Sequence, residues 1–294
     1  MIRTLLCWWL AIRPKTLVAS LSPVLLGLML SLMDGGVYVW PAVLTGLCAM
    51  CLQIGANFAN DYYDFKKGAD TSERKGPIRM VAAGLIKPVA MKRAMVGIFV
   101  FAFMLGLMLV AVAGWPIFMI GVVSILLAWG YTAGPVALAY TGLADSVALT
   151  FFGPVAVAGT YFIQRGVWSM DAIYLGLGVG AISTALLTVN NLRDRIEDAA
   201  SGKRTLVVRF GHVFGCVYYC LSLGISVGIL VAYCFYESVT GRVMSLVYAM
   251  FILNLSRSVW EYQGAQFNRL LGLTGAAITL YAVCYCVVMV AGHV

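Results

Sequence analysis

Two short segments of this chain, residues 57–70 and 190–204, place amide and carboxylate side chains in matching patterns. In each, an asparagine stands four residues before an aspartate, and another aspartate follows three or four residues later. Such spacings put side chains on one face of a helix. The side chains are Asn57, Asn60, Asp61, Asp64 and Asp70 in the first segment and Asn190, Asp194 and Asp198 in the second. The sequence therefore predicts two helix faces crowded with carboxylates, one in each of two weakly repeated halves.

Carboxylates packed this closely repel one another unless a cation lies among them. Oxygen ligands without thiolate or imidazole suit Mg²⁺ better than zinc. Mg²⁺ is commonly held by one or two carboxylates together with the phosphate oxygens of a substrate. Two facing clusters could hold one diphosphate through bridging metals, so we expect Mg²⁺ as the cofactor, bound as two ions.

Basic side chains follow each acidic cluster and could neutralise the remaining diphosphate oxygens. They are Lys67, Arg74 and Arg79 after the first cluster and Lys203 and Arg204 after the second. A structural alternative is that the aspartates only cap helix ends and pair with nearby lysines. That alternative explains a single aspartate, but not the asparagines inside apolar stretches or the repeated spacing, so we favour a functional site.

The chain around these clusters is strongly apolar, because 62% of its 294 residues are hydrophobic, 11% are charged and the mean hydropathy is +0.93. This composition excludes a soluble globular domain. Residues 1–10 are expected to form an interfacial helix. Stretches long enough to cross about 30 Å of hydrocarbon lie at residues 17–33, 37–59, 94–113, 115–133, 143–163, 172–192, 213–236, 243–259 and 270–290. The sequence predicts an all-α polytopic membrane protein with nine transmembrane helices.

The basic residues are distributed unevenly between the two sides that these spans define. Of the 20 lysines and arginines, all except Arg165 and Arg242 fall before the first span or after the even-numbered spans. Positive charge favours the cytoplasmic side. Both acidic clusters are therefore expected to face the cytoplasm of a cell membrane, and the net charge of +8 reflects topology rather than nucleic-acid binding.

Several motifs resemble the UbiA superfamily of intramembrane prenyltransferases, over nearly the whole chain. The two aspartate motifs are typical of the superfamily, whereas R-P-K-T-L at residues 13–17 and the stretch 190–209 resemble its dihydroxynaphthoate branch more narrowly. Further similar stretches lie at residues 76–79, 131–135, 142–145 and 151–153. One departure is Ala144, where the family pattern G-L-G-D has glycine.

The resemblance implies a single domain over residues 1–294, with nine helices around a central cavity. It implies that the Mg²⁺–diphosphate unit is bound by Asn57, Asp61, Asp64, Asp194 and Asp198, with Asp70 closing the first motif. It implies phosphate contacts from Lys67, Arg79, Lys203 and Arg204. Asn60 and Asn190, which belong to the two motifs, are expected to contact substrate as well.

The implied activity is Mg²⁺-dependent transfer of a polyprenyl group from polyprenyl diphosphate to 1,4-dihydroxy-2-naphthoate. Demethylmenaquinol, diphosphate and CO₂ would be the products, as in menaquinone synthesis by a bacterial inner-membrane enzyme. Metal ions and basic side chains would stabilise the departing diphosphate, and a dry pocket would protect the prenyl cation from water. Another aromatic acceptor, such as 4-hydroxybenzoate, is the main alternative.

Four residues are candidates for contact with the prenyl cation or the aromatic acid. The rings of Tyr131 and Tyr140 could stabilise a cation, or they could belong to an interfacial aromatic belt. Asp145 could orient the acceptor or cap a helix. Lys15 could bind the acceptor's carboxylate or anchor the N-terminus at the cytoplasmic surface.

Other classes of membrane protein also use intramembrane aspartates. A secondary transporter would place them near the bilayer midplane, usually at broken helices. Here both clusters lie at the ends of spans and continue into basic loops, which fits a phosphate site better. The D-G-x-x-A-R signature of CDP-alcohol phosphotransferases is absent from the sequence.

Overall fold

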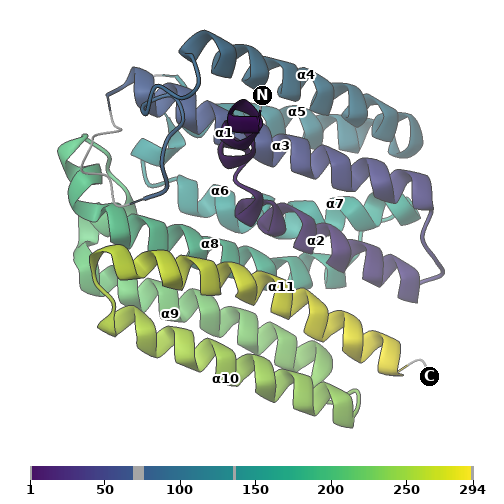
Figure 1. Cartoon of the computed structure of the whole chain (residues 1–294). Helices are drawn as coiled ribbons and strands as arrows, with labels where there is room; N and C mark the ends of the chain where they lie inside the picture. The colour runs from purple at the N-terminus through teal and green to yellow at the C-terminus, as the bar shows by residue number, and fades with distance from the viewer. Residues whose placement is uncertain (1, 69–75, 135–136, 293–294) are drawn as a thin grey trace.

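The computed structural model describes residues 2–68, 76–134 and 137–292, and within these ranges the chain is helical without strands (Figure 1). The first half contains α1 (Ile2–Ile12), α2 (Pro14–Met33), α3 (Val39–Lys66), α4 (Pro88–Ala113), α5 (Trp115–Gly130) and the 3₁₀ turn η1 (Leu138–Tyr140). The second contains α6 (Ala144–Phe151), α7 (Pro154–Arg165), α8 (Met170–Ala200), α9 (Leu206–Cys234), α10 (Val239–Glu261), the turn η2 (Gly264–Gln266) and α11 (Phe267–Gly292). The predicted all-α class is confirmed.

All nine predicted spans are found among the described residues. Eight are long and apolar enough to cross a membrane, and the ninth, α5, is a shorter apolar helix. The chain is thus a multi-pass membrane protein.

Proline stands in the first turn of α2, α4, α5 and α7, where its missing N–H costs no helical hydrogen bond.

The fifth span is broken between α6 and α7, at Gly153. A side chain at Gly153 would collide with the carbonyl oxygens of Leu149 and Gly176, and one at Gly180 would collide with Leu149. The glycines of α8 therefore let the broken span approach its backbone closely, as small residues do in membrane bundles. This contact holds the start of α6 beside α8, where the Thr184 hydroxyl donates to the Asp145 carbonyl oxygen at 3.5 Å.

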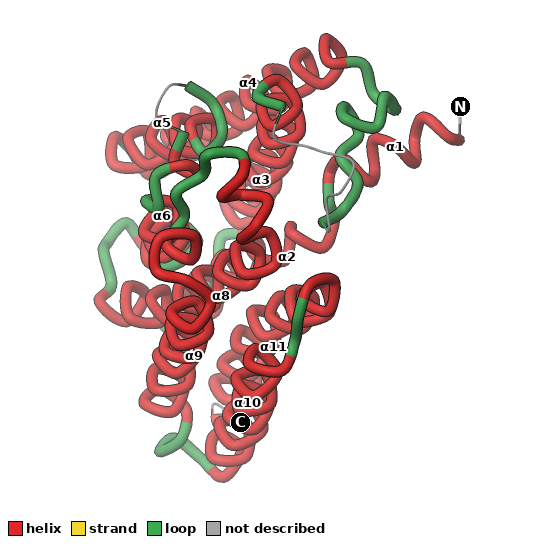
Figure 2. The backbone as a smooth tube through the Cα atoms, turned by 90° about the vertical axis from the view of Figure 1, so that its left-hand side faces the viewer, coloured by secondary structure: helices red, strands yellow, loops and turns green. Residues whose placement is uncertain are grey.

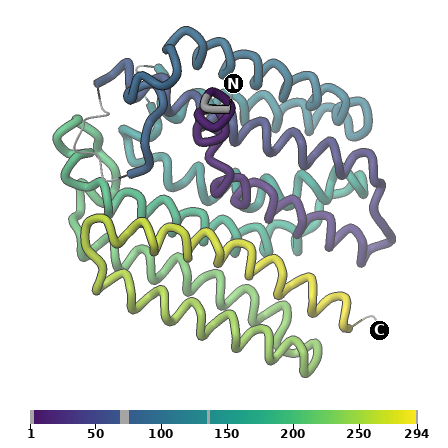
Figure 3. The backbone as a smooth tube through the Cα atoms, in the orientation of Figure 1, coloured from purple at the N-terminus to yellow at the C-terminus, as the bar shows by residue number. Residues whose placement is uncertain are grey.

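Helix α8 occupies the middle of the bundle (Figure 3). Its buried apolar residues join those of α2, α7, α9, α10 and α11 in the largest core cluster, whereas α1, α3 and α4 form a smaller one. Large apolar side chains elsewhere, such as Phe101, Leu221 and Met250, are more than half exposed and suit contact with lipid. The core thus fixes α8, which carries the second aspartate segment, against both halves.

The C-terminal ends of α3 and α8, which carry the two aspartate segments, lie at the same end of the bundle, on the left in Figure 1. Figure 2 looks onto this end, where several connecting loops gather. Helix α1 packs here on α3, with Trp8 edge-on to Phe58 at 5.7 Å between ring centroids, while Leu5 and Trp9 remain exposed. An apolar exposed face is what the predicted interfacial helix requires; its depth in a membrane stays a prediction.

Candidate functional site

Four aspartates of the two segments are almost completely buried. Asp61 and Asp64 on α3 are 1% and 2% exposed, and Asp194 and Asp198 on α8 are each 6% exposed. A buried carboxylate is costly unless it is paired or hydrogen-bonded. The partners of each carboxylate therefore indicate what it does.

The two aspartates of α3 bind the chain that returns toward α4. The carboxylate of Asp61 accepts from the backbone N–H groups of Met80 at 2.9 Å and Val81 at 3.0 Å, so both its oxygens are used. One oxygen of Asp64 accepts from Arg79 at 2.9 Å, and its other oxygen, Oδ1, is buried without a partner. Asp64 thus keeps an oxygen for a ligand, whereas Asp61 is committed to the loop.

Arg193 holds Asp194 in a two-pronged ion pair. Its Nε and Nη2 atoms donate to the two carboxylate oxygens of Asp194, each at 2.6 Å. The same guanidinium donates to Asn190 at 2.7 Å and to Asn268 of α11 at 2.8 Å. Sequence reasoning gave Arg193 no role; the signal that could have found it was an arginine directly after an apolar span and directly before an aspartate.

Lys203 joins the second segment to the first. Gly202, with φ of 78°, turns the chain back so that the Lys203 ammonium pairs with Asp198 at 3.0 Å. Burial lowers the pKa of Lys203, but the carboxylates of Asp64 and Asp198 outweigh that effect and raise it overall. Lys203 is therefore protonated and lies in the field of one aspartate from each segment.

Lys67 approaches the same place from the end of α3. Its ammonium donates to the Thr132 carbonyl oxygen at 2.7 Å. Partial burial lowers the pKa of Lys67, the carboxylate of Asp64 opposes that shift, and the charge of Lys203 adds to it. The two predicted phosphate-binding lysines are thus close enough to repel each other.

Tyr131, just after α5, lies among the acidic groups. Burial raises the pKa of its hydroxyl above the usual value, and the carboxylates of Asp145, Asp64 and Asp198 raise it further, while Arg79 opposes them. Charges from α3, α6 and α8 therefore surround one phenol. Sequence reasoning placed Tyr131 at either a site or an aromatic belt, and this electrostatic environment favours the site.

Asp145 stands in the first turn of α6 and is 3% exposed. Leu143 occupies the N-cap position of this helix, and the Oδ2 atom of Asp145 is buried without a hydrogen-bond partner. A buried oxygen left unsatisfied in a native protein requires an explanation, such as a missing ligand. The unsatisfied oxygen supports the acceptor role considered for Asp145, and the capping role stays open beside it.

The other predicted site residues bind neighbouring helices, are only half-buried or are exposed. The amide of Asn57 donates to the Ile12 carbonyl at 2.8 Å and to the Thr16 hydroxyl at 2.9 Å, which ties α3 to the N-terminal helices. Asn60 is half-buried, and Lys15 and Arg204 are exposed. Asp70 and Arg74 lie outside the described residues.

The donor set suits Mg²⁺ in its chemistry. No group of three or more histidine, cysteine, aspartate or glutamate side chains close enough for a metal occurs among the described residues. Mg²⁺ does not need such a cage, since one or two carboxylates and substrate phosphates commonly suffice. The unpartnered Oδ1 of Asp64 and the carboxylate of Asp198 supply hard oxygens of this kind.

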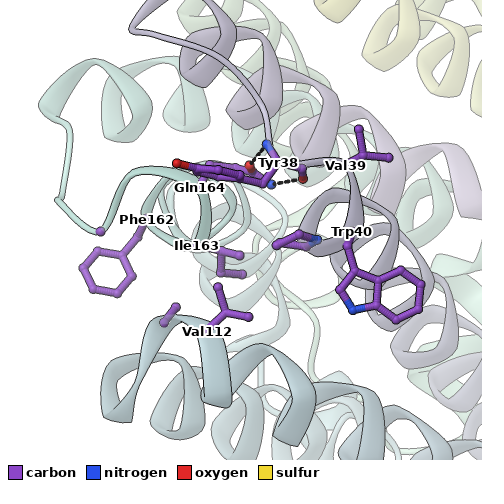
Figure 4. A pocket seen from close by; sticks show the side chains of 10 residues that line it. Tyr38, Val39, Trp40, Val112, Phe162, Ile163 and Gln164 are labelled. Carbon is purple, nitrogen blue, oxygen red and sulfur yellow. Dashed lines mark hydrogen bonds between the residues drawn. The ribbon is translucent and has the colours of Figure 1, made fainter.

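A separate groove of about 520 Å³ lies at the opposite end of α3 (Figure 4). It is bordered by Tyr38, Trp40, Val112 and Phe162, and Gln164 exchanges hydrogen bonds with the Tyr38 backbone at 2.7 and 3.3 Å. No charged side chain lines it. The groove is therefore distinct from the site of the aspartates.

A model of the UbiA prenyltransferase family matches residues 20–281. The chain belongs to this family. As a member it is a prenyltransferase, which confirms the predicted enzyme class and sets aside the transporter interpretation.

Individual family members and solved structures agree with this assignment. The 1,4-dihydroxy-2-naphthoate octaprenyltransferase of Haemophilus influenzae is 34% identical over 254 residues, which cover 84% of this chain and 81% of that protein. The Escherichia coli protein of the same name is 38% identical over 224 residues, covering 74% and 73%. A UbiA homolog from Archaeoglobus fulgidus, solved with GPP and Mg²⁺, shares the fold with a TM-score of 0.71 at 15% identity, covering 97% of this chain and 99% of that one.

Proposed function

We propose that this prenyltransferase moves a polyprenyl group from polyprenyl diphosphate to 1,4-dihydroxy-2-naphthoate, giving demethylmenaquinol, diphosphate and CO₂. The observation that carries the donor half of the proposal is that groups from both segments meet at one place. Lys67, after the first segment, and Lys203, which pairs with Asp198 at 3.0 Å, lie against the same ring of Tyr140. The acceptor is supported by the names of relatives that match most of this chain.

On the donor side, the chain supplies both ligands and counter-charges. Asp64 and Asp198 offer carboxylate oxygens to Mg²⁺. Asn57, Asp61 and Asp194, the other ligands that the family resemblance implies, already bind groups of the chain, so as ligands they would have to exchange those partners for the metal. When bound, Mg²⁺ stabilises the negative charge that develops on the departing diphosphate. We propose two ions, because the two segments offer two sets of oxygens.

The basic side chains perform the same electrostatic task from fixed positions. Arg79 is 6% exposed, and Lys203 is held by its ion pair, so neither has to reorganise when the allylic C–O bond breaks. Lys67 is exposed, and the Thr132 carbonyl oxygen holds its ammonium at 2.7 Å. Together these cations make the diphosphate a better leaving group.

On the acceptor side, Asp145 and Tyr131 are positioned to bind a hydroxylated ring. The unpartnered Oδ2 of Asp145 can accept a hydrogen bond from a ring hydroxyl, which raises the electron density of the ring. The Tyr131 hydroxyl lies among the same carboxylates and can orient the acceptor or the prenyl group. Because Asp145 is buried and Tyr131 is half-buried, the new C–C bond can form with little water present.

We propose that the end of the bundle with the aspartate segments lies on the cytoplasmic side of a bacterial inner membrane. The support is that all but two of the lysines and arginines fall on that side of the predicted topology. A phosphatase reporter fused after residue 294 should be active, because the odd number of spans would place it outside. An inactive reporter there would overturn the orientation.

The direct test supplies membranes containing the protein with Mg²⁺, a labelled polyprenyl diphosphate and either dihydroxynaphthoate or 4-hydroxybenzoate. A prenylated naphthoquinol that requires Mg²⁺ and is lost in Asp64→Asn and Asp198→Asn is the expected product. Product from hydroxybenzoate alone would move the chain to another branch of the family. No transfer to either acceptor would refute the proposal.

A further inference from the structure

The ring of Tyr140 lies against two ammonium groups from different parts of the chain. The Nζ atom of Lys67, at the end of α3, is 4.4 Å from the ring centroid, and that of Lys203, after α8, is 5.5 Å away. A cation within about 6 Å of an aromatic centroid is attracted by the face of the ring. Tyr140 is thus a shared contact of the two lysines.

Two like charges brought to one ring repel each other unless other groups hold them there. Lys67 is tied to the Thr132 carbonyl oxygen at 2.7 Å, and Lys203 is tied to Asp198 at 3.0 Å. The backbone N–H of Arg204 donates to the Tyr140 carbonyl oxygen at 3.2 Å, which fixes η1 beside Lys203. Contacts with the chain therefore hold both ammonium groups in place, and the ring of Tyr140 contacts each of them.

An aromatic belt does not explain this arrangement. Belt residues place a ring at headgroup depth and need no specific cation, whereas Tyr140 is half-buried with an ammonium of each segment within reach. Paired ammonium groups that remain partly accessible, beside buried carboxylates that can hold metal, are complementary to an anion with two phosphate groups. Diphosphate is the ligand of that chemistry, and this step rests on the proposed function.

We propose that Tyr140 is a positioning residue whose ring holds the ammonium groups of Lys67 and Lys203 at a spacing at which they bind one diphosphate together. The contact with both ammonium groups is made by the face of the ring, which phenylalanine retains. Removing the ring lets the two lysines separate and weakens binding of the prenyl diphosphate without changing the acceptor's contacts.

The test compares Tyr140→Phe and Tyr140→Leu in the full-length protein in membranes or detergent. Losing both partly exposed cation–π contacts should raise KM for the prenyl diphosphate about five- to tenfold in Tyr140→Leu. The value of kcat and the KM for the aromatic acceptor should change less than about twofold, and Tyr140→Phe should resemble the wild type throughout. Tyr262→Leu is the matched control, because Tyr262 is half-buried at the same end and packs on apolar side chains.

Two further measurements separate positioning from a structural effect. In the double variant Lys67→Met with Tyr140→Leu, the fold-increase in KM should be smaller than the product of the two single fold-increases. Each single change already removes the contact between Lys67 and the Tyr140 ring, so the second change cannot remove it again. Calorimetry with inorganic diphosphate and Mg²⁺ measures binding without turnover. The wild type and Tyr140→Phe should bind diphosphate with similar affinity, and Tyr140→Leu should bind it more weakly. If the leucine variant is lost from the membrane fraction, Tyr140→Met, which also lacks a ring, replaces it.

The inference is overturned if Tyr140→Leu leaves KM and diphosphate affinity unchanged, if Tyr140→Phe loses as much as Tyr140→Leu, or if the double variant shows independent effects. These outcomes differ from failure of the proposed function, in which the wild-type protein would transfer no prenyl group and bind no diphosphate.

Discussion

The two aspartate segments look alike in sequence but are held in different ways. On α3, Asp61 binds backbone N–H groups of the loop toward α4, and Asp64 pairs with an arginine fifteen residues later. On α8, Asp194 pairs with the arginine directly before it, and Asp198 pairs with Lys203 five residues later. Each segment thus combines one aspartate that the chain fully engages with one that retains capacity for a ligand.

This difference teaches that matched motifs need not imply matched roles at each position. Asp61 organises a loop, whereas Asp194 anchors Arg193 and, through it, Asn268 on α11. Asp198 pairs with Lys203, and the charge of Asp64 acts on the same ammonium, raising the pKa of Lys203. The engaged pair should matter most for stability and the ligand-facing pair most for catalysis.

Arg193→Ala is expected to have the largest effect, on stability. It leaves the carboxylate of Asp194 buried and uncompensated, which typically costs about 3–5 kcal/mol. Thermal unfolding in detergent should show a large drop, and Arg204→Ala, at an exposed position, should show none. An unchanged unfolding temperature for Arg193→Ala would mean that this ion pair contributes nothing to the bundle.

Asp64→Asn and Asp198→Asn should each reduce prenyl transfer about a hundred- to a thousandfold, as removal of one preorganised charge at a reacting centre commonly does. The amide retains one oxygen for the neighbouring cation but binds Mg²⁺ poorly. Turnover and unfolding temperature are measured on the same samples. A variant with a lower unfolding temperature but normal turnover would reverse the roles assigned to the two pairs.

Asp61→Asn should be milder and act mainly on the loop. One of the two backbone donors, at Met80 or Val81, would face an amide N–H instead of an oxygen, which costs about 1–3 kcal/mol. Protease sensitivity of residues 76–87 should rise, measured by limited digestion against the wild type. Equal protection in both proteins would show that Asp61 does not order this loop.

Lys15→Ala should have the smallest effect, with KM for the aromatic acceptor within about twofold of the wild type. Lys15 is exposed on α2, which fits the topological role that the sequence left open better than contact with the acceptor. Asp145→Asn is the comparison, because its carboxylate is buried with one oxygen unsatisfied. A larger increase in acceptor KM for Lys15→Ala than for Asp145→Asn would reverse this assignment.

The spans and the positions of the acidic segments could be predicted because hydrophobic length and charge asymmetry are local signals. The contact of Arg193 with Asn268 could not, since Asn268 lies 75 residues away and only the bundle brings them together. The break at Gly153 was hidden within one apolar stretch, because the backbone contacts that require it come from α8. The cation pair at Tyr140 likewise depends on three separate segments meeting. The duplication of the two halves and the central cavity stay predictions.

Calorimetry of inorganic diphosphate binding to the purified protein, with and without Mg²⁺, tests most directly whether the two segments form one site. One diphosphate per chain should bind only when Mg²⁺ is present, and either Asp64→Asn or Asp198→Asn alone should abolish binding. Two diphosphates per chain, or full affinity after a change in one segment, would show that the segments act separately.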